Sequence, residues 1–173
     1  MTALTRLALL PVALLLPLSA ASAHVTLENR EAVAGASFKL VLRVPHGCSG
    51  AATTKLRARI PEAFRSAKPQ PKPGWTLDVV TAKGAAAGGG HGHDDATAPQ
   101  EVSWTGVLGD ASYDEFVLWV STAKTAPLGP VYVPIVQECG DKVQRWIEIP
   151  SDGNAPASLK SPAPSFRLIG QPS

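Results

Sequence analysis

The chain has 173 residues, of which 45% are hydrophobic, and it carries 16 Lys and Arg against 14 Asp and Glu. This near-neutral balance, without a basic stripe or a run of like charges, argues against a partner such as nucleic acid or an anionic membrane surface. The length suits one domain of ordinary size behind a short leader.

The N-terminal segment has the three parts of a secretory signal. Arg6 precedes an apolar run at 7–18, and small residues in an A-x-A pattern follow at 21–23. The run contains two prolines and is shorter than the ~20 residues of a spanning helix, which disfavours the alternative of an uncleaved anchor. We therefore expect a signal peptide at 1–23, cleavage before His24, and no membrane span after cleavage.

Alternation with period two dominates the rest of the chain. In 37–45 and 55–61, apolar residues alternate with polar or basic ones, as in half-buried strands. Further strands are expected at 24–29, 75–81, 101–105, 113–122, 131–138 and 143–149. No stretch of ten or more residues has a helical period. The pattern predicts an all-β fold, an antiparallel β-sandwich.

Two regions fall outside this pattern. Residues 84–99 (GAAAGGGHGHDDATAP) are of low complexity and are expected to form a flexible, exposed loop. Residues 151–173 are rich in Pro, Ser and Ala and are expected to form a loosely attached tail. The predicted folded domain is therefore 24–150.

The chain has two cysteines, Cys48 and Cys139. In an exported protein a disulfide is the first interpretation, and it would close a loop of roughly 90 residues worth ~4–5 kcal/mol in the chain-entropy model. A thiolate pair for metal or redox chemistry is the alternative. Neither cysteine belongs to a C-x-x-C motif, which favours the disulfide.

His24 would become the first residue of the processed chain. An N-terminal histidine offers its α-amine and its imidazole Nδ1 to one metal ion, and both lose a proton at modest cost near neutral pH. Nitrogen ligands favour Cu(II) or Ni(II) over Zn(II). The only methionine is Met1, so soft ligands for Cu(I) are lacking once the cysteines are paired. The alternative is that His24 follows the cleavage site by chance.

Trp146 is the second unusual residue. The apolar positions of 143–149 are Val143, Ile147 and Ile149, which puts Trp146 on the opposite, polar face. A tryptophan there is either a packing lid under a loop or the wall of a binding site.

Three other histidines are candidate ligands. His46 follows a predicted strand, so it is either an ordinary turn residue or a ligand, if the N-terminal strand pairs close to this turn. His91 and His93 lie in the low-complexity loop, where they are expected to bind metal weakly, as an auxiliary or incidental site.

Motifs of common enzymes are missing from the sequence: it has no G-x-S-x-G, P-loop, H-E-x-x-H or dinucleotide-binding fingerprint. Carboxylates such as Glu115 and Glu138 are more simply strand-edge or surface residues. We expect a protein that is not an enzyme.

Seven short motifs occur in a fixed order along the chain. They are His24-Val25-Thr26-Leu27, Arg43-Val44-Pro45, Thr53-Thr54-Lys55, Lys72-Pro73-Gly74-Trp75-Thr76, Val102-Ser103-Trp104-Thr105-Gly106, Tyr113-Asp114-Glu115-Phe116 and Arg145-Trp146-Ile147. Together they resemble the YcnI-like copper-binding domain over about 24–150. Segments 44–48 and 136–139 look like its cysteine-containing branch from Gram-negative bacteria.

The resemblance implies an immunoglobulin/fibronectin-like sandwich that binds Cu(II) in a mono-histidine brace. His24 matches the brace histidine, and Trp146 matches a tryptophan that packs beside the metal. The family's glutamate ligand has no counterpart, because the matching loop, 46–52, contains no carboxylate. The third ligand is then His46, a carboxylate from elsewhere such as Glu138 or Glu148, or water.

These observations lead to an expected function in copper handling. The protein would bind Cu(II) in the periplasm as a chaperone, a buffer or a feeder, and its partner would be a membrane copper transporter or another periplasmic copper carrier. Two other classes stay open: a copper-dependent oxidative enzyme and a metal-free interaction domain.

Overall fold

The computed structural model describes residues 24–81, 98–151 and 158–171, and these form strands with no α-helix among them. The strands are β1 (Thr26–Leu27), β2 (Glu31–Val33), β3 (Ser37–Val44), β4 (Thr53–Arg59), β5 (Phe64–Pro69), β6 (Thr76–Val80), β7 (Glu101–Leu108), β8 (Asp114–Thr122), β9 (Gly129–Tyr132), β10 (Ile135–Cys139), β11 (Lys142–Trp146) and β12 (Ser165–Ile169). The predicted leader, 1–23, lies outside the described residues, as do positions 84–97 of the predicted loop 84–99, with His91 and His93. Within the described part, no helix has the length and apolarity to cross a membrane.

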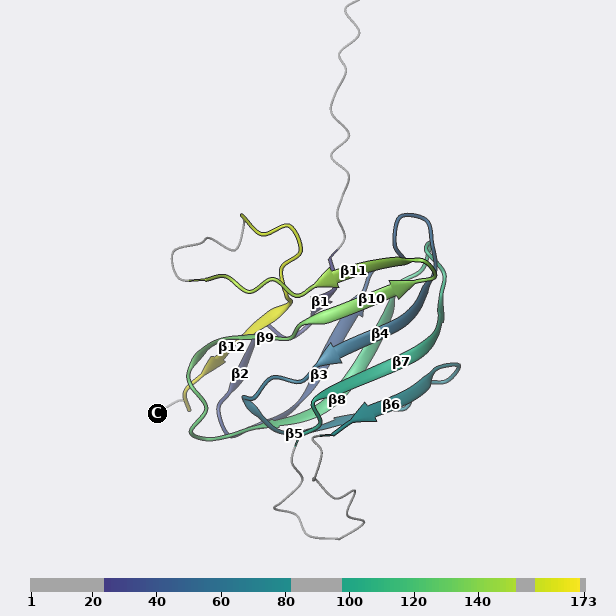
Figure 1. Cartoon of the computed structure of the whole chain (residues 1–173). Coiled ribbons are helices and arrows are strands. Elements are labelled where there is room, and N and C mark those ends of the chain that lie inside the picture. Colours follow the sequence, from purple (N-terminus) through teal and green to yellow (C-terminus); the bar gives the residue numbers. More distant parts are fainter. Residues whose placement is uncertain (1–23, 82–97, 152–157, 172–173) are drawn as a thin grey trace, which may run out of the picture.

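The strands form two main sheets and one smaller one (Figure 1). One main sheet has the order β1-β3-β8-β5, the other β11-β10-β4-β7-β6, and the smaller sheet β2-β12-β9. All pairs are antiparallel except β12 with β2. The prediction of an all-β, antiparallel sandwich is confirmed.

The core lies between the two main sheets, where the alternation predicted it. Leu40, Leu42 and Val44 of β3 are fully buried, as are Leu56 and Ala58 of β4. Burying a side chain of leucine size contributes roughly 1.5–3 kcal/mol, so the regular alternation of β3 and β4 is enough to fix which face of each strand turns inward.

The C-terminal segment is not a loosely attached tail. Residues 165–169 form β12, whose Phe166 and Leu168 are almost completely buried. Phe166 contacts Phe38 and Phe64, with ring centroids 5.6 and 6.0 Å apart. The prediction was wrong because β12 carries only two inward apolar residues, a short pattern among prolines and serines. The folded unit therefore extends past residue 150.

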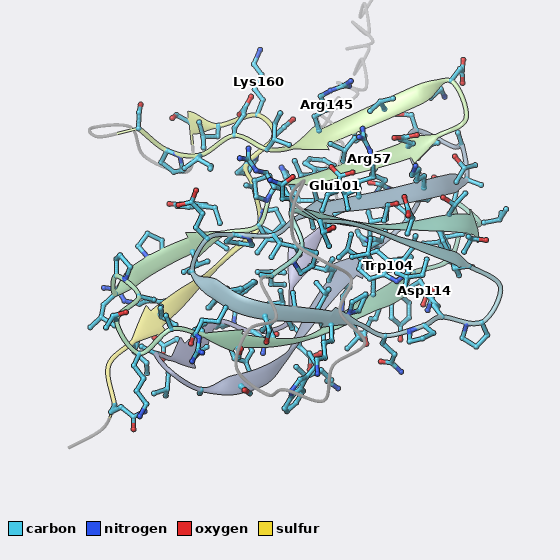
Figure 2. All side chains as sticks on the ribbon, turned by 60° about the horizontal axis from the view of Figure 1, so that its bottom comes forward. Arg57, Glu101, Trp104, Asp114, Arg145 and Lys160 are labelled. Carbon is cyan, nitrogen blue, oxygen red and sulfur yellow. A yellow bond between two sulfur atoms is a disulfide. The ribbon has the colours of Figure 1, made fainter. Side chains whose placement is uncertain are left out.

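Three motifs behind the resemblance gather in one aromatic cluster. The Phe116 ring lies 4.9 Å from the Trp75 ring and 5.4 Å from the Trp104 ring, measured between centroids. Lys72 lies over Phe116 and donates to Asp114 at 2.7 Å; Figure 2 shows Trp104 and Asp114 close together. These motifs therefore serve packing, and this cluster is separate from the candidate metal residues described below.

Gly106 tests how tightly this cluster is packed. A Cβ built on Gly106 would lie 2.4 Å from a ring carbon of Trp75, whereas one on Gly109 would meet nothing within 4 Å. We expect Gly106→Ala to lower the free energy of unfolding by about 1–3 kcal/mol through overpacking, and Gly109→Ala to change it little. Urea unfolding checks this, and equal stabilities for the two variants would contradict it.

Candidate metal centre

His24 and Trp146 lie where edge strands of the two main sheets meet. His24 lies two residues before β1, an edge strand of one sheet, and Trp146 is the last residue of β11, an edge strand of the other. Their ring centroids are 4.7 Å apart, with 50° between the ring planes. In Figure 1, β1 and β11 run close together at one side of the sandwich. The two residues that the resemblance paired are thus in direct contact.

The turn that carries His46 follows β3, the strand on which β1 pairs. Strand β1 pairs with β3 in a register that sets Thr26 opposite Arg43. Two steps back along this antiparallel register bring His24 level with Pro45, the residue before His46. The condition set for His46 as a ligand, an N-terminal strand paired close to this turn, is therefore met.

The imidazole of His46 is oriented by a contact with the next residue. Its Nδ1 lies within hydrogen-bond distance of the Gly47 carbonyl oxygen. A carbonyl can only accept, so Nδ1 is the donor, and in the neutral imidazole this leaves the lone pair on Nε2. A neutral imidazole in this state can ligate a metal through Nε2.

Trp146 is buried, and the neighbouring apolar residues are not. Trp146 is 5% exposed, while Val143, Ile147 and Ile149 are 40%, 43% and 51% exposed. The predicted apolar face is thus the outer one, which corrects the prediction. Trp146 pairs in register with the fully buried Ile135, so both side chains turn inward. Val143 and Ile147 alternate with Trp146 along the chain and therefore turn outward.

The predicted disulfide between Cys48 and Cys139 is confirmed, with the Cα atoms 5.8 Å apart. It joins the turn after β3 to the end of β10. His46 lies two residues before Cys48, and β10 is the strand on which β11 pairs. The bond therefore ties the His46 turn to the hairpin that carries Trp146.

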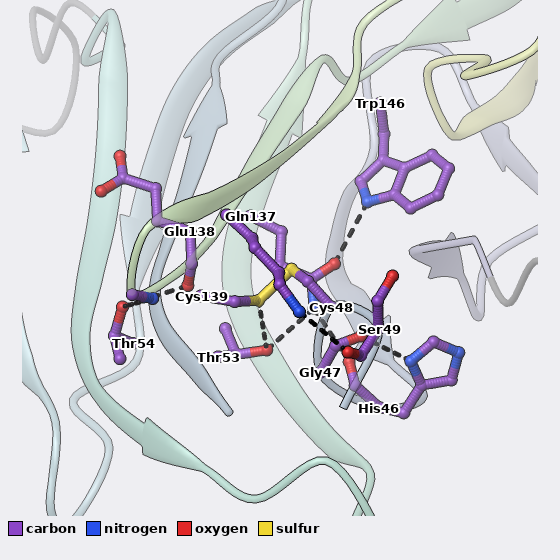
Figure 3. Close-up of a disulfide and its surroundings, with 12 residues drawn as sticks. His46, Gly47, Cys48, Ser49, Thr53, Thr54, Gln137, Glu138, Cys139 and Trp146 are labelled. Carbon is purple, nitrogen blue, oxygen red and sulfur yellow. Dashed lines mark hydrogen bonds between the residues drawn. A yellow bond between two sulfur atoms is a disulfide. The ribbon is translucent and has the colours of Figure 1, made fainter. Parts of the chain in front are cut away.

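Gln137 is a site residue that the sequence reasoning missed. Its side chain is 2% exposed and lies between Trp146 and the His46 turn. It accepts a hydrogen bond from the Trp146 indole at 3.2 Å and donates to the His46 carbonyl at 2.8 Å. Figure 3 shows these bonds beside the disulfide. One feature of the sequence could have indicated it: Gln137 is a single polar residue between Ile135 and Cys139 on the same face of the strand.

Two carboxylates that were considered as the third ligand interact with other groups of the protein. Glu138 follows Gln137 on β10, so it turns to the opposite face of the sheet, where it lies 2.9 Å from Arg57 Nε. The Glu148 carboxylate accepts the backbone N–H of Ser161 at 3.0 Å. The structure therefore contradicts Glu138 as a ligand beside Trp146 and gives Glu148 a local structural role.

A groove of about 490 Å³ opens beside His24. It is lined by β1 and by Glu28, Arg43 and Tyr132, with residues 162–165 on its far side. Glu28 lies four positions after His24, roughly 13 Å along an extended chain at 3.3 Å per residue. The Glu28 carboxylate also lies 4.0 Å from the Arg43 guanidinium.

Across residues 24–81, 98–151 and 158–171, no three His, Cys, Asp or Glu side chains gather closely enough to hold a metal ion. The nitrogen donors of this region are the imidazoles of His24 and His46. Cleavage before His24 would add one more, because its peptide nitrogen would become an amine. A donor set of two or three nitrogens suits Cu(II).

The chain belongs to the family of the domain of unknown function DUF1775, whose family model matches residues 24–168. This is the YcnI-like domain, so the resemblance is confirmed at the level of the family, and the match extends into β12. No curated protein matches the chain.

Two solved structures are similar to this chain. An uncharacterized protein from Nocardia farcinica, described as having an immunoglobulin-like fold, is 26% identical with a TM-score of 0.61; the match covers 84% of this chain and 97% of that one. A cohesin–dockerin complex from Clostridium thermocellum matches at 10% identity and a TM-score of 0.43, over 86% of this chain and 98% of that one. The first of these supports the immunoglobulin-like architecture.

Proposed function

We propose that the processed protein binds one Cu(II) ion through the α-amine and imidazole of His24, and that it carries copper in the periplasm. The observation that supports this most directly is the contact between the His24 and Trp146 rings, 4.7 Å apart between centroids. It holds the first imidazole of the processed chain against a buried indole, at the edge of a rigid sandwich.

The chemistry of the donors favours copper in its oxidised form. An amine and an imidazole from one residue close a chelate ring, and nitrogen donors prefer Cu(II). Both sulfur atoms are tied in the disulfide, so the described residues offer no thiolate for Cu(I). The Nε2 atom of His46 is the protein donor that we propose as a further ligand, because β1 pairs close to the turn that carries it, and water is the alternative.

We infer that the protein captures copper and does not catalyse a reaction. The Trp146 indole covers one side of the His24 imidazole, which restricts the approach of water there. Residue 24 lies at the edge of its sheet, and the groove opens beside it, so a partner can reach the metal. A membrane copper transporter or another periplasmic carrier is the partner that such a task requires.

Substituting His24 tests this proposal. Protein processed at residue 24 should bind one equivalent of Cu(II), and His24→Ala, which keeps the α-amine, should bind it more than ~100-fold more weakly. Loss of an outer-shell partner alone typically costs about 10–100-fold, so loss of a ligand should cost more. Competition titration with a chromophoric chelator measures both affinities.

The matched control is His91→Ala/His93→Ala, which removes the two histidines of the low-complexity loop. It should bind copper with the affinity of the unsubstituted protein. The proposal is wrong if His24→Ala binds normally, and loss of binding in the loop variant would move the site to residues 91 and 93.

A further inference from the structure

The side chain of Gln137 forms three hydrogen bonds between Trp146, the His46 turn and Thr53. Its Oε1 accepts from Trp146 Nε1 at 3.2 Å, and its Nε2 donates to His46 O and to Thr53 Oγ1, both at 2.8 Å. A carboxamide has two N–H donors, so both are used. Figure 3 shows all three bonds.

The partners fix the orientation of this amide. An indole N–H can only donate and a backbone carbonyl can only accept, so oxygen must face Trp146 and nitrogen must face His46. The opposite orientation would break both bonds inside the protein, at 2% exposure, where unpaired polar groups are costly. The amide therefore has a single orientation, and its hydrogen bond fixes the position of the Trp146 indole N–H.

The network continues to the disulfide. Thr53 Oγ1 lies 3.8 Å from Cys139 Sγ, and because a disulfide sulfur carries no hydrogen, the hydroxyl of Thr53 is the donor. Thr53 is fully buried. One connected set of bonds thus runs from the ring beside His24, through Gln137, to the His46 turn and the Cys48–Cys139 bond.

We propose that Gln137 is the positioning residue of the copper site: its carboxamide sets the orientation of Trp146 and the position of the His46 turn relative to each other. The expected effect of Gln137 on copper binding rests on the proposed function. Its expected effect on Trp146 does not. Gln137 touches no metal. It acts through the indole that packs on His24 and through the backbone of His46.

The test compares Gln137→Met with Gln144→Leu. The first keeps the length of the side chain and removes all three bonds; the second removes a carboxamide from the residue that pairs with Gln137 in register on β11. In metal-free protein, the indole N–H resonance of Trp146, assigned with Trp146→Phe, should shift in Gln137→Met and stay in place in Gln144→Leu.

In copper-loaded protein, Gln137→Met should bind Cu(II) about 10–100-fold more weakly, as is typical when an outer-shell partner is lost, with a changed EPR spectrum. Gln144→Leu should match the unsubstituted protein. If the unsubstituted protein binds no copper, the proposed function fails, and the indole resonance still decides the role of Gln137. An unshifted resonance, or unchanged affinity and spectrum, overturns the inference.

A measurement on the unsubstituted protein covers the case in which Gln137→Met does not fold. The indole hydrogen of Trp146, if it donates to a buried carboxamide, should exchange with solvent far more slowly than that of Trp119, whose residue is 53% exposed. Equal exchange rates would overturn the inference without any variant.

Discussion

Replacing both cysteines in Cys48→Ser/Cys139→Ser is expected to remove roughly 4–5 kcal/mol from the free energy of unfolding. The disulfide spans 91 positions of sequence, and the chain-entropy model gives about this value for a loop of that length. Domains of this size are stable by only ~5–15 kcal/mol in all, so the variant should lie close to its unfolding threshold. Chemical denaturation, with intact protein as reference, measures the change.

A second variant separates the cross-link from the buried hydroxyls that serine introduces. Cys48→Ala/Cys139→Ala removes the same cross-link and adds no polar group to a site where both cysteines are almost fully buried. It should lose a similar amount of stability. Any further loss of stability in the serine variant measures the cost of burying the two hydroxyls. If both variants unfold at the denaturant concentration of intact protein, the disulfide contributes no stability.

The same variants should disturb copper binding. The disulfide and the Gln137 bond both hold the His46 turn to β10, so removing the disulfide should loosen the turn. We expect an altered Cu(II) EPR spectrum in any variant that still folds. An unchanged spectrum would mean that the disulfide stabilises the fold without shaping the site.

Strong alternation allowed most of the sandwich to be predicted. Residues 37–45 and 55–61 contain long, regular patterns, and β3 and β4 form there. Strands β2 and β5 were missed because their inward apolar residues are too few to form a pattern; β2 has only three residues. Parallel pairing of β12 with β2 joins segments far apart in the chain, which local periodicity cannot indicate.

The candidate site could be predicted in part. The expected processing site singled out His24, and the pattern of 143–149 singled out Trp146. The resemblance placed both at one site, and the structure brings their rings together. The position of the His46 turn depended on the register of β1 with β3, which no local pattern contains. Gln137 was missed because a buried glutamine looks like an interruption of an apolar face until its three partners are seen.

The surroundings of Glu138 and Glu148 could not be predicted for a similar reason. Sequence shows that a carboxylate lies near Trp146 along the chain, but not which face of the sheet it turns to. Glu138 pairs with Arg57, and Glu148 accepts a hydrogen bond from the Ser161 backbone. Both partners lie outside the segment around Trp146, so the local sequence does not reveal them.

The α-amine of His24 is the donor on which the proposed copper site depends most. Acetylating it removes its lone pair from ligation and leaves every side chain intact. Acetylation is a cleaner test than adding a residue, because an added residue would bring a new amine and a peptide nitrogen that could themselves chelate copper beside His24. The modification is selective at mildly acidic pH, where lysine amines are protonated.

The measurement that tests the central claim most directly is therefore Cu(II) binding, by EPR and competition titration, of protein processed to His24 before and after acetylation of this amine. We predict that affinity falls by more than ~100-fold, beyond the usual cost of an outer-shell change, and that the nitrogen hyperfine pattern is lost. The same affinity and spectrum after acetylation would contradict the account and direct the search to His46 and to residues 91 and 93.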